Sequence, residues 1–232
     1  PYRLKGCTAV VWAGKTDKFY QLPTMDTGDP INKLTLKYEP ENNISNNHLD
    51  ALWHSGPLLM FSSENISNTE NVSLVRNTND ITIGITRGNN PVDASKYDIQ
   101  LITANNFYDY KNNVGESSKN IIYHPCSVEE EDSKTALQTR LHTLRFIKDA
   151  DTTFSITEKA SGKTIDIGGK TTINLIDYLL MSKPKMMGDQ EYLDRRYEWD
   201  INIRIGDKEE NGYIALSITI NNWTYWFQPT DM

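Results

Sequence analysis

The sequence predicts an all-β protein built as a sandwich, and two segments near the C-terminus carry most of that prediction. From Tyr197 to Ile205 every odd position is apolar and every even position is charged or an amide, the period-two pattern of a strand with one buried face. In the next apolar run, 213–220, one face carries Ile214, Leu216, Ile218 and Ile220. The polar segment between them, 206–212, has glycine at both ends, so we expect an antiparallel hairpin.

Shorter strands recur along the rest of the chain and are separated by polar turns. The expected strands are residues 6–12, 34–38, 72–76, 81–87, 97–103, 135–147, 154–157 and 164–167. Within 81–87, three isoleucines alternate with polar residues, which again indicates one buried face. The spacing of these strands is typical of a sandwich with little helix.

Two segments are predicted to be helical. Residues 173–181 are the strongest helix candidate, and Pro184 ends it because proline disfavours helical geometry in the residue before it. Leu49–Trp53, followed by Gly56 and Pro57, is predicted to form a short helical turn and a break. We therefore expect a domain boundary at about residue 56.

Composition excludes several classes of protein. With 38% hydrophobic and 10% aromatic residues among 232, the chain can build a core. Its net charge of −7 argues against binding to nucleic acid or to an anionic membrane, since surfaces that do so are usually basic. No stretch approaches the roughly 18 apolar residues that a membrane-spanning helix needs.

Several short motifs, taken in order, give the chain a family resemblance. They are Val10–Gly14, Leu52–Gly56, Leu74–Asn79, Tyr108–Asn112, Ile122–Pro125, Leu175–Pro184, Asp189–Arg195 and Ile218–Trp223. Together they resemble the fimbrillin-associated minor or anchor subunits of Bacteroidales fimbriae, over nearly the whole chain. It is the order of the motifs that carries the resemblance, since each motif alone is short.

The resemblance implies an organisation and a function. It implies tandem transthyretin-like β-sandwich domains, with residues 1–56 as the C-terminal remainder of the first domain and 57–232 as the second. It implies a non-enzymatic minor or anchor subunit on the outer membrane, assembling with other fimbrial subunits through β-strand contacts. On this view any lipid anchor belongs to a segment upstream of Pro1.

Motifs for catalysis and cofactor binding are missing from the sequence. There is no Gly-x-Ser-x-Gly elbow, no glycine-rich phosphate loop and no His-Glu-x-x-His, so we expect neither an enzyme nor a cofactor. The four histidines are far apart in sequence, and His124 with Cys126 is too small a set to predict a metal site. Cys7 and Cys126 either pair or remain buried free thiols, and we favour free thiols. The acidic run Glu129–Asp132 is predicted to be a solvated loop.

A segment of mixed charge precedes the C-terminal strands. Its candidate contacts with a neighbouring subunit are Asp189, Glu191, Asp194 and Arg195. The alternative, which we favour, is that these charges form ion pairs within the chain.

Aromatic residues crowd the C-terminus. Trp223, Tyr225 and Phe227 share one face of a predicted strand, where burial of each contributes roughly 1.5–3 kcal/mol, so we assign them to the core. Trp226 lies on the opposite face. Exposed aromatic rings bind sugars in many modules, so the alternative function is a surface lipoprotein that binds host or dietary glycans through Trp226.

Overall fold

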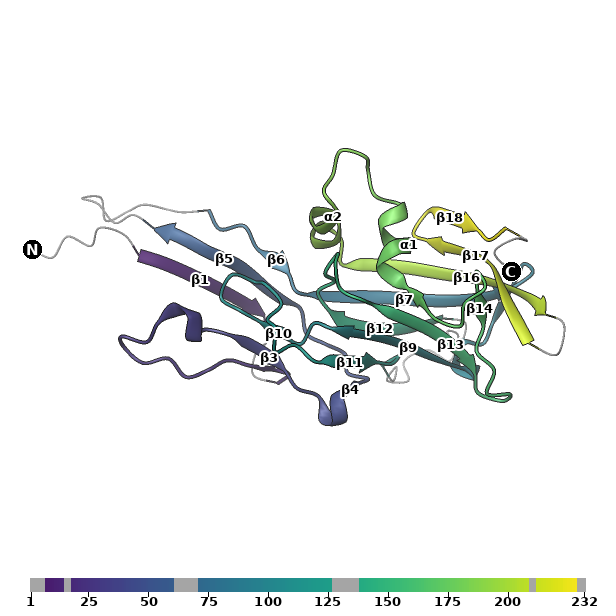
Figure 1. The fold of residues 1–232 in the computed structure, drawn as a ribbon, viewed down its shortest axis with the longest axis horizontal. Coiled ribbons are helices and arrows are strands. Elements are labelled where there is room, and N and C mark those ends of the chain that lie inside the picture. The colour runs from purple at the N-terminus through teal and green to yellow at the C-terminus, as the bar shows by residue number, and fades with distance from the viewer. Residues whose placement is uncertain (1–6, 15–17, 61–70, 127–137, 209–211, 229–232) are drawn as a thin grey trace, which may run out of the picture.

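The computed structural model describes residues 7–14, 18–60, 71–126, 138–208 and 212–228. Within these ranges the protein is mostly β, and its two largest sheets share one continuous hydrophobic core. Figure 1 shows β1, β5 and β6 at the end of the molecule where the chain starts, and the larger sheets at the other end. The all-β, sandwich-like fold predicted from the sequence is confirmed.

A seven-stranded mixed sheet forms one layer of the core. Its order is β12 (Gln138–Leu144), β7 (Thr78–Arg87), β16 (Glu198–Lys208), β17 (Gly212–Ile220) and β14 (Asp166–Ile167), with β8 (Asn90–Val92) beside β7 and β18 (Trp223–Trp226) beside β17. The expected face of β16 is buried: Trp199, Ile201, Ile203 and Ile205 are each at most 1% exposed. β16 pairs antiparallel with β17 and parallel with β7.

A five-stranded sheet supplies the facing layer. Its order is β15 (Ile173–Asn174), β13 (Thr153–Glu158), β9 (Tyr97–Ala104), β11 (Asn120–Tyr123) and β4 (Ile44–Ser45). Along β9 every second residue from Tyr97 is buried, because one face of this strand packs into the core while the other meets solvent.

Two three-stranded sheets complete the described chain. One has the order β1 (Cys7–Gly14), β5 (Leu52–Met60), β6 (Val75–Arg76), and the other β10 (Phe107–Tyr108), β3 (Leu36–Tyr38), β2 (Tyr20–Gln21). The predicted helical turn at Leu49–Trp53 is wrong, because Leu52 and Trp53 begin β5 and pair with β1. The boundary expected at about residue 56 falls within β5, and β3 and β4 pair with strands from beyond it. The domain limits 1–56 and 57–232 stay a prediction.

Strict alternation along β17 is also wrong, because a β-bulge interrupts it. Ile203 pairs with Ile218, but Ile205 pairs with Ala215, so Leu216 is the extra residue. The extra residue exchanges the faces of the residues on one side of the bulge, here those that precede Leu216. Ala215 therefore faces the core in place of Leu216, and it is 0% exposed.

Two short helices contact each other, and Figure 1 shows them on the same side of the molecule as β18. The helix predicted in residues 173–181 is confirmed as α1 (Leu175–Met181), which Asn174 caps by accepting a hydrogen bond from the N–H of Ile176. α2 (Asp189–Arg195) was not predicted as a helix. Three 3-10 turns span Ile31–Lys33, Glu41–Asn43 and Ala94–Lys96. Across the described ranges, no helix has the length and apolar character needed to cross a bilayer.

Candidate functional site

The charged residues of α2 bind one another and nearby strands. Asp194 accepts two hydrogen bonds of 2.7 Å from the guanidinium of Arg145, which follows β12. Arg145 also donates to the carbonyl oxygen of Asn112 at 2.8 Å, and Gln190 donates to Asp194 at 2.8 Å. Since Arg145 and Asp194 are only 12% and 18% exposed, their ion pair is shielded from solvent and fixes α2 against the sheet.

The other three candidate contacts on α2 also have partners within the chain. Asp189 Oδ1 lies 3.3 Å from Nζ of Lys183, and Glu191 Oε1 lies 2.8 Å from Nη2 of Arg195. The Glu191–Arg195 pair is exposed at both ends, and exposed ion pairs contribute little to stability, whereas Lys183 is only 19% exposed. Glu191 and Arg195 can therefore exchange their partner for one on another molecule at small cost.

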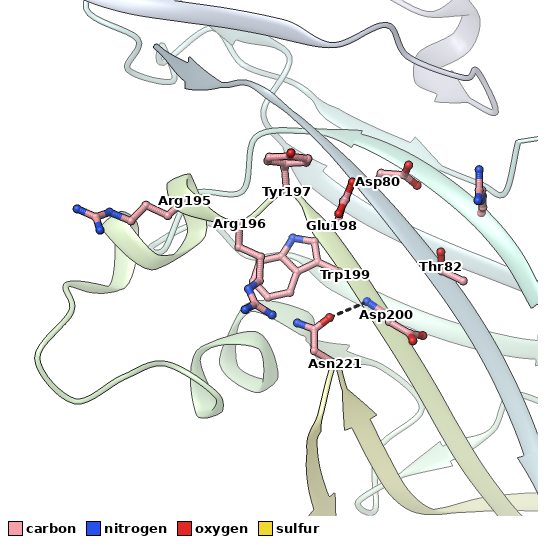
Figure 2. A pocket seen from close by; sticks show the side chains of 10 residues that line it. Asp80, Thr82, Arg195, Arg196, Tyr197, Glu198, Trp199, Asp200 and Asn221 are labelled. Carbon is pink, nitrogen blue, oxygen red and sulfur yellow. Dashed lines mark hydrogen bonds between the residues drawn. The ribbon is translucent and has the colours of Figure 1, made fainter. Parts of the chain in front are cut away.

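A polar cavity of about 600 Å³ opens where the chain leaves α2 and enters β16. Its lining residues are Asp80, Thr82, Arg140, Arg195, Arg196, Tyr197, Glu198, Trp199, Asp200 and Asn221. Figure 2 shows that the labelled residues come from β7, from 195–200 and from the β17–β18 turn, and that the side chain of Arg195 points away from the others. Asn221, at φ 53°, accepts a 3.0 Å hydrogen bond from the N–H of Asp200 and closes one side. Charges of both signs line this cavity, which suits a polar partner.

A second cavity, of about 530 Å³, lies between α2 and the β5–β6 end of the molecule. Trp53 and Tyr197 meet edge to face there, with ring centroids 6.2 Å apart and an interplanar angle of 71°. The guanidinium of Arg76 stacks on Tyr197 at 4.1 Å, a cation–π contact. Glu191 and Arg195 line the same cavity. Sequence reasoning missed this site because Trp53, Arg76 and Tyr197 belong to three separate strands or connections.

The aromatic C-terminal segment is only partly in the core. Phe227 is 6% exposed, and its ring contacts Tyr178 of α1 and Tyr225, as predicted. Trp223 does not belong to the core, because it is 54% exposed. It lies at the start of β18 and lines a small cavity together with Ser182, Tyr192 and Arg196. Unlike Tyr225 and Phe227, it makes no aromatic contact with Tyr178 of α1 among the described residues.

Trp226 is exposed, as its position on the opposite face predicts. It is 53% exposed, and the guanidinium of Arg204 lies 5.7 Å from its ring. β18 thus carries two half-exposed tryptophans at its two ends.

Three of the histidines and cysteines that are scattered in sequence meet in space. His48, Cys126 and His142 each place a ligand atom within 4.8 Å of the other two. His124 is not part of this cluster, because its Nδ1 atom lies 3.2 Å from Oδ1 of Asp98. Burial lowers the pKa of His142 to about 4, although the negative charge of Asp80 acts to raise it.

The structure describes the side chain of one of the two cysteines, Cys126. Cys126 is a buried free thiol, and burial raises its pKa. The side chain of Cys7 and the acidic run Glu129–Asp132 lie outside the described residues.

Comparison with known proteins decides the family. Residues 1–229 match the model of the fimbrillin-A associated anchor proteins Mfa1 and Mfa2. The chain belongs to this family. Mfa2-family membership makes it an accessory protein of cell-surface fimbriae, and the family is one of anchor proteins, not of enzymes.

Solved structures are similar to this member of the Mfa2 family. A protein from Bacteroides thetaiotaomicron, for which polysaccharide binding is suggested, is 26% identical with a TM-score of 0.82, covering 100% of this chain and 80% of that one. A suggested adhesin from Bacteroides ovatus is 20% identical with a TM-score of 0.74, covering 97% and 77%. The fimbrial anchor protein Mfa2 from Porphyromonas gingivalis is 16% identical with a TM-score of 0.68, covering 97% and 78%. The last two bear on the fold alone. No curated protein sequence matches the chain.

Proposed function

We propose that the protein is a minor or anchor subunit of a fimbria at the outer membrane, joined to neighbouring subunits by β-strand pairing. The observation that carries this proposal is the family match over residues 1–229. Strand pairing between chains needs an exposed sheet edge, where main-chain groups supply affinity and alternate side chains supply register.

β18 offers such an edge. Among the described residues it pairs with β17 alone. The N–H of Phe227 donates to the carbonyl oxygen of Leu216 at 3.1 Å, and successive N–H groups of a strand point to opposite sides. The N–H groups of Thr224 and Trp226 therefore point away from β17, toward an incoming strand. The half-exposed rings of Trp223 and Trp226 would pack against that strand.

α2 supplies the charged part of the proposed contact. Asp189, Glu191 and Arg195 are accessible to a partner, and the ion pair between Glu191 and Arg195 is a weak one at the surface. Asp194 would act differently, by holding α2 in position through Arg145.

Co-purification of the full chain with the other fimbrial subunits of its own organism tests this function. Thr224→Pro removes one outward N–H, and proline is tolerated at such edge positions. Thr224→Ala is the matched control, since it removes only the exposed hydroxyl pair with Thr219. We expect the alanine variant to bind like the wild type and the proline variant to lose binding. Equal binding by the two variants would exclude β18 as the contact. Failure of the wild type to bind any fimbrial subunit would exclude the proposed function itself.

A second function, glycan binding through Trp226, is favoured by the exposure of that ring and its stacking with Arg204. Aromatic faces bind the apolar faces of sugars, and a polar group beside the ring fixes their orientation. Titration with oligosaccharides should then quench tryptophan fluorescence, and Trp226→Ala should abolish the response. A response that survives in Trp226→Ala would exclude this residue as the sugar contact.

A further inference from the structure

We propose that His48, Cys126 and His142 form a binding site for a divalent metal ion of the zinc class. A thiolate with two imidazoles is a ligand set that zinc accepts in tetrahedral sites. The three ligand atoms already lie within 4.8 Å of one another. Zinc bond lengths of about 2.0–2.3 Å place tetrahedral ligands roughly 3.5 Å apart, so small side-chain rotations close the site.

Backbone hydrogen bonds hold the three ligand segments together before any metal binds. The N–H of Cys126 donates to the carbonyl oxygen of Arg140 at 2.9 Å, which places Cys126 beside the strand that carries His142. The N–H of His124 donates to the carbonyl oxygen of Ser45 at 2.8 Å, which brings the segment containing His48 to the same place. Because these segments are already held in place, little conformational entropy is lost when the ion binds.

His142 supplies a second and independent observation. Its side chain is 3% exposed, yet neither ring nitrogen has a hydrogen-bond partner among the described residues. A buried polar atom without a partner destabilises the folded state. A metal bound to one of these nitrogens would offset that cost.

Asp80 extends the site beyond its three ligands. Its Oδ1 atom lies 3.8 Å from Nε2 of His142 and also has no hydrogen-bond partner among the described residues. Carboxylates in this position commonly orient a metal-binding imidazole. If the metal binds Nδ1 of His142, a small rotation would let Asp80 accept a hydrogen bond from the N–H at Nε2.

The ion would join three parts of the fold. It would tie edge strand β12 to the segments that follow β4 and β11. Three protein ligands leave the fourth tetrahedral position open. Water or a donor atom from another molecule can occupy that position.

Zinc titration of the metal-free full chain, kept reduced, tests the site by calorimetry. We expect one ion per chain, and His48→Ala should weaken binding by about 10- to 100-fold or more, as loss of a ligand costs at least as much as loss of the group that orients it. His48 is exposed, so this variant should fold. His124→Ala is the matched control and should bind zinc like the wild type.

Cobalt substitution provides a readout on the unmodified protein. Co²⁺ in the wild type should produce a thiolate-to-metal charge-transfer band in the near ultraviolet, and Cys126→Ser should lose that band. Absence of the band in the wild type, or equal zinc affinity in wild type and His48→Ala, would overturn the proposal.

Discussion

Arg145 and Asp194 join α2 to the end of β12 through two parallel hydrogen bonds of 2.7 Å. Such a bidentate pair is stronger and more directional than a single ion pair. Because Arg145 also binds the carbonyl oxygen of Asn112, one guanidinium holds a helix, a strand end and a loop together.

Removal of Arg145 should therefore destabilise the protein strongly. Arg145→Met keeps the length and apolar stem of the side chain but leaves the carboxylate of Asp194 shielded and without a positive partner, with only the hydrogen bond from Gln190. We expect a loss of about 2–4 kcal/mol in the free energy of unfolding, measured by urea denaturation. Arg195→Met is the control, because its ion pair is exposed, and it should change stability by less than about 0.5 kcal/mol. Similar losses in both variants would contradict the structural role of the Arg145 pair.

His54 should make stability fall in mild acid. The imidazole is fully buried, packs on Trp12 and accepts a 2.9 Å hydrogen bond at Nδ1 from the N–H of Gly56. Burial, together with the charge of Arg145, lowers its pKa from 6.5 to about 4. Protonation therefore favours the unfolded chain between these two values, and stability present above pH 6.5 is lost as the pH falls toward 4.

The expected loss from His54 is about 3 kcal/mol, to be measured as urea midpoints between pH 7 and pH 4. His54→Gln should flatten this dependence by about half, since His142 also has a lowered pKa. An unchanged pH dependence in His54→Gln would show that His54 does not contribute to it.

The bulge in β17 predicts unequal roles for two neighbouring apolar residues. Ile218 is 1% exposed, whereas Leu216 lies outside the core and packs over Gly206. Ile218→Ser should cost about 3–4 kcal/mol and Leu216→Ser about 1 kcal/mol in the free energy of unfolding. Strict alternation, without a bulge, would give the two variants similar costs.

The two faces of β16 should respond differently to substitution. Ile203 is fully buried and pairs with Ile218 and Ile85. Ile203→Asp places a charge in an apolar environment and should destabilise the fold by several kcal/mol. Glu198 points to solvent on the other face, so thermal unfolding of Glu198→Ala should match that of the wild type. Equal effects from the two substitutions would refute the assignment of faces.

Much of the β architecture could be predicted because the information is local. The alternation in Tyr197–Ile205 and in Ile81, Ile83 and Ile85 reflects the period of a pleated strand, which needs only neighbours in sequence. The prediction failed at Leu216, since a bulge is set by how two strands register against each other. It failed again at Leu52, where pairing with β1 overrides the local preference for a turn.

The candidate sites could be predicted far less well. The charge of Asp189–Arg195 marked a contact segment, but the sequence does not reveal that Arg145, 49 residues away, would bind Asp194. The exposure of Trp226 followed from the face of its strand. Alternation places Trp223 on the same face as Phe227 and so predicts that it is buried. That prediction is wrong because alternation does not show how far along β18 this face is covered.

The sequence by itself determined that residues 81–87, 97–103 and 198–205 are strands, which face of β16 is buried and to which family the chain is similar, because periodic patterns and ordered motifs are properties of the chain alone. Only the tertiary structure decided that His48, Cys126 and His142 would meet, and that Trp53, Arg76 and Tyr197 would share a cavity. These residues come together through hydrogen bonds between distant strands. Such pairings are selected by the packing of the whole core, and no short window of sequence contains them.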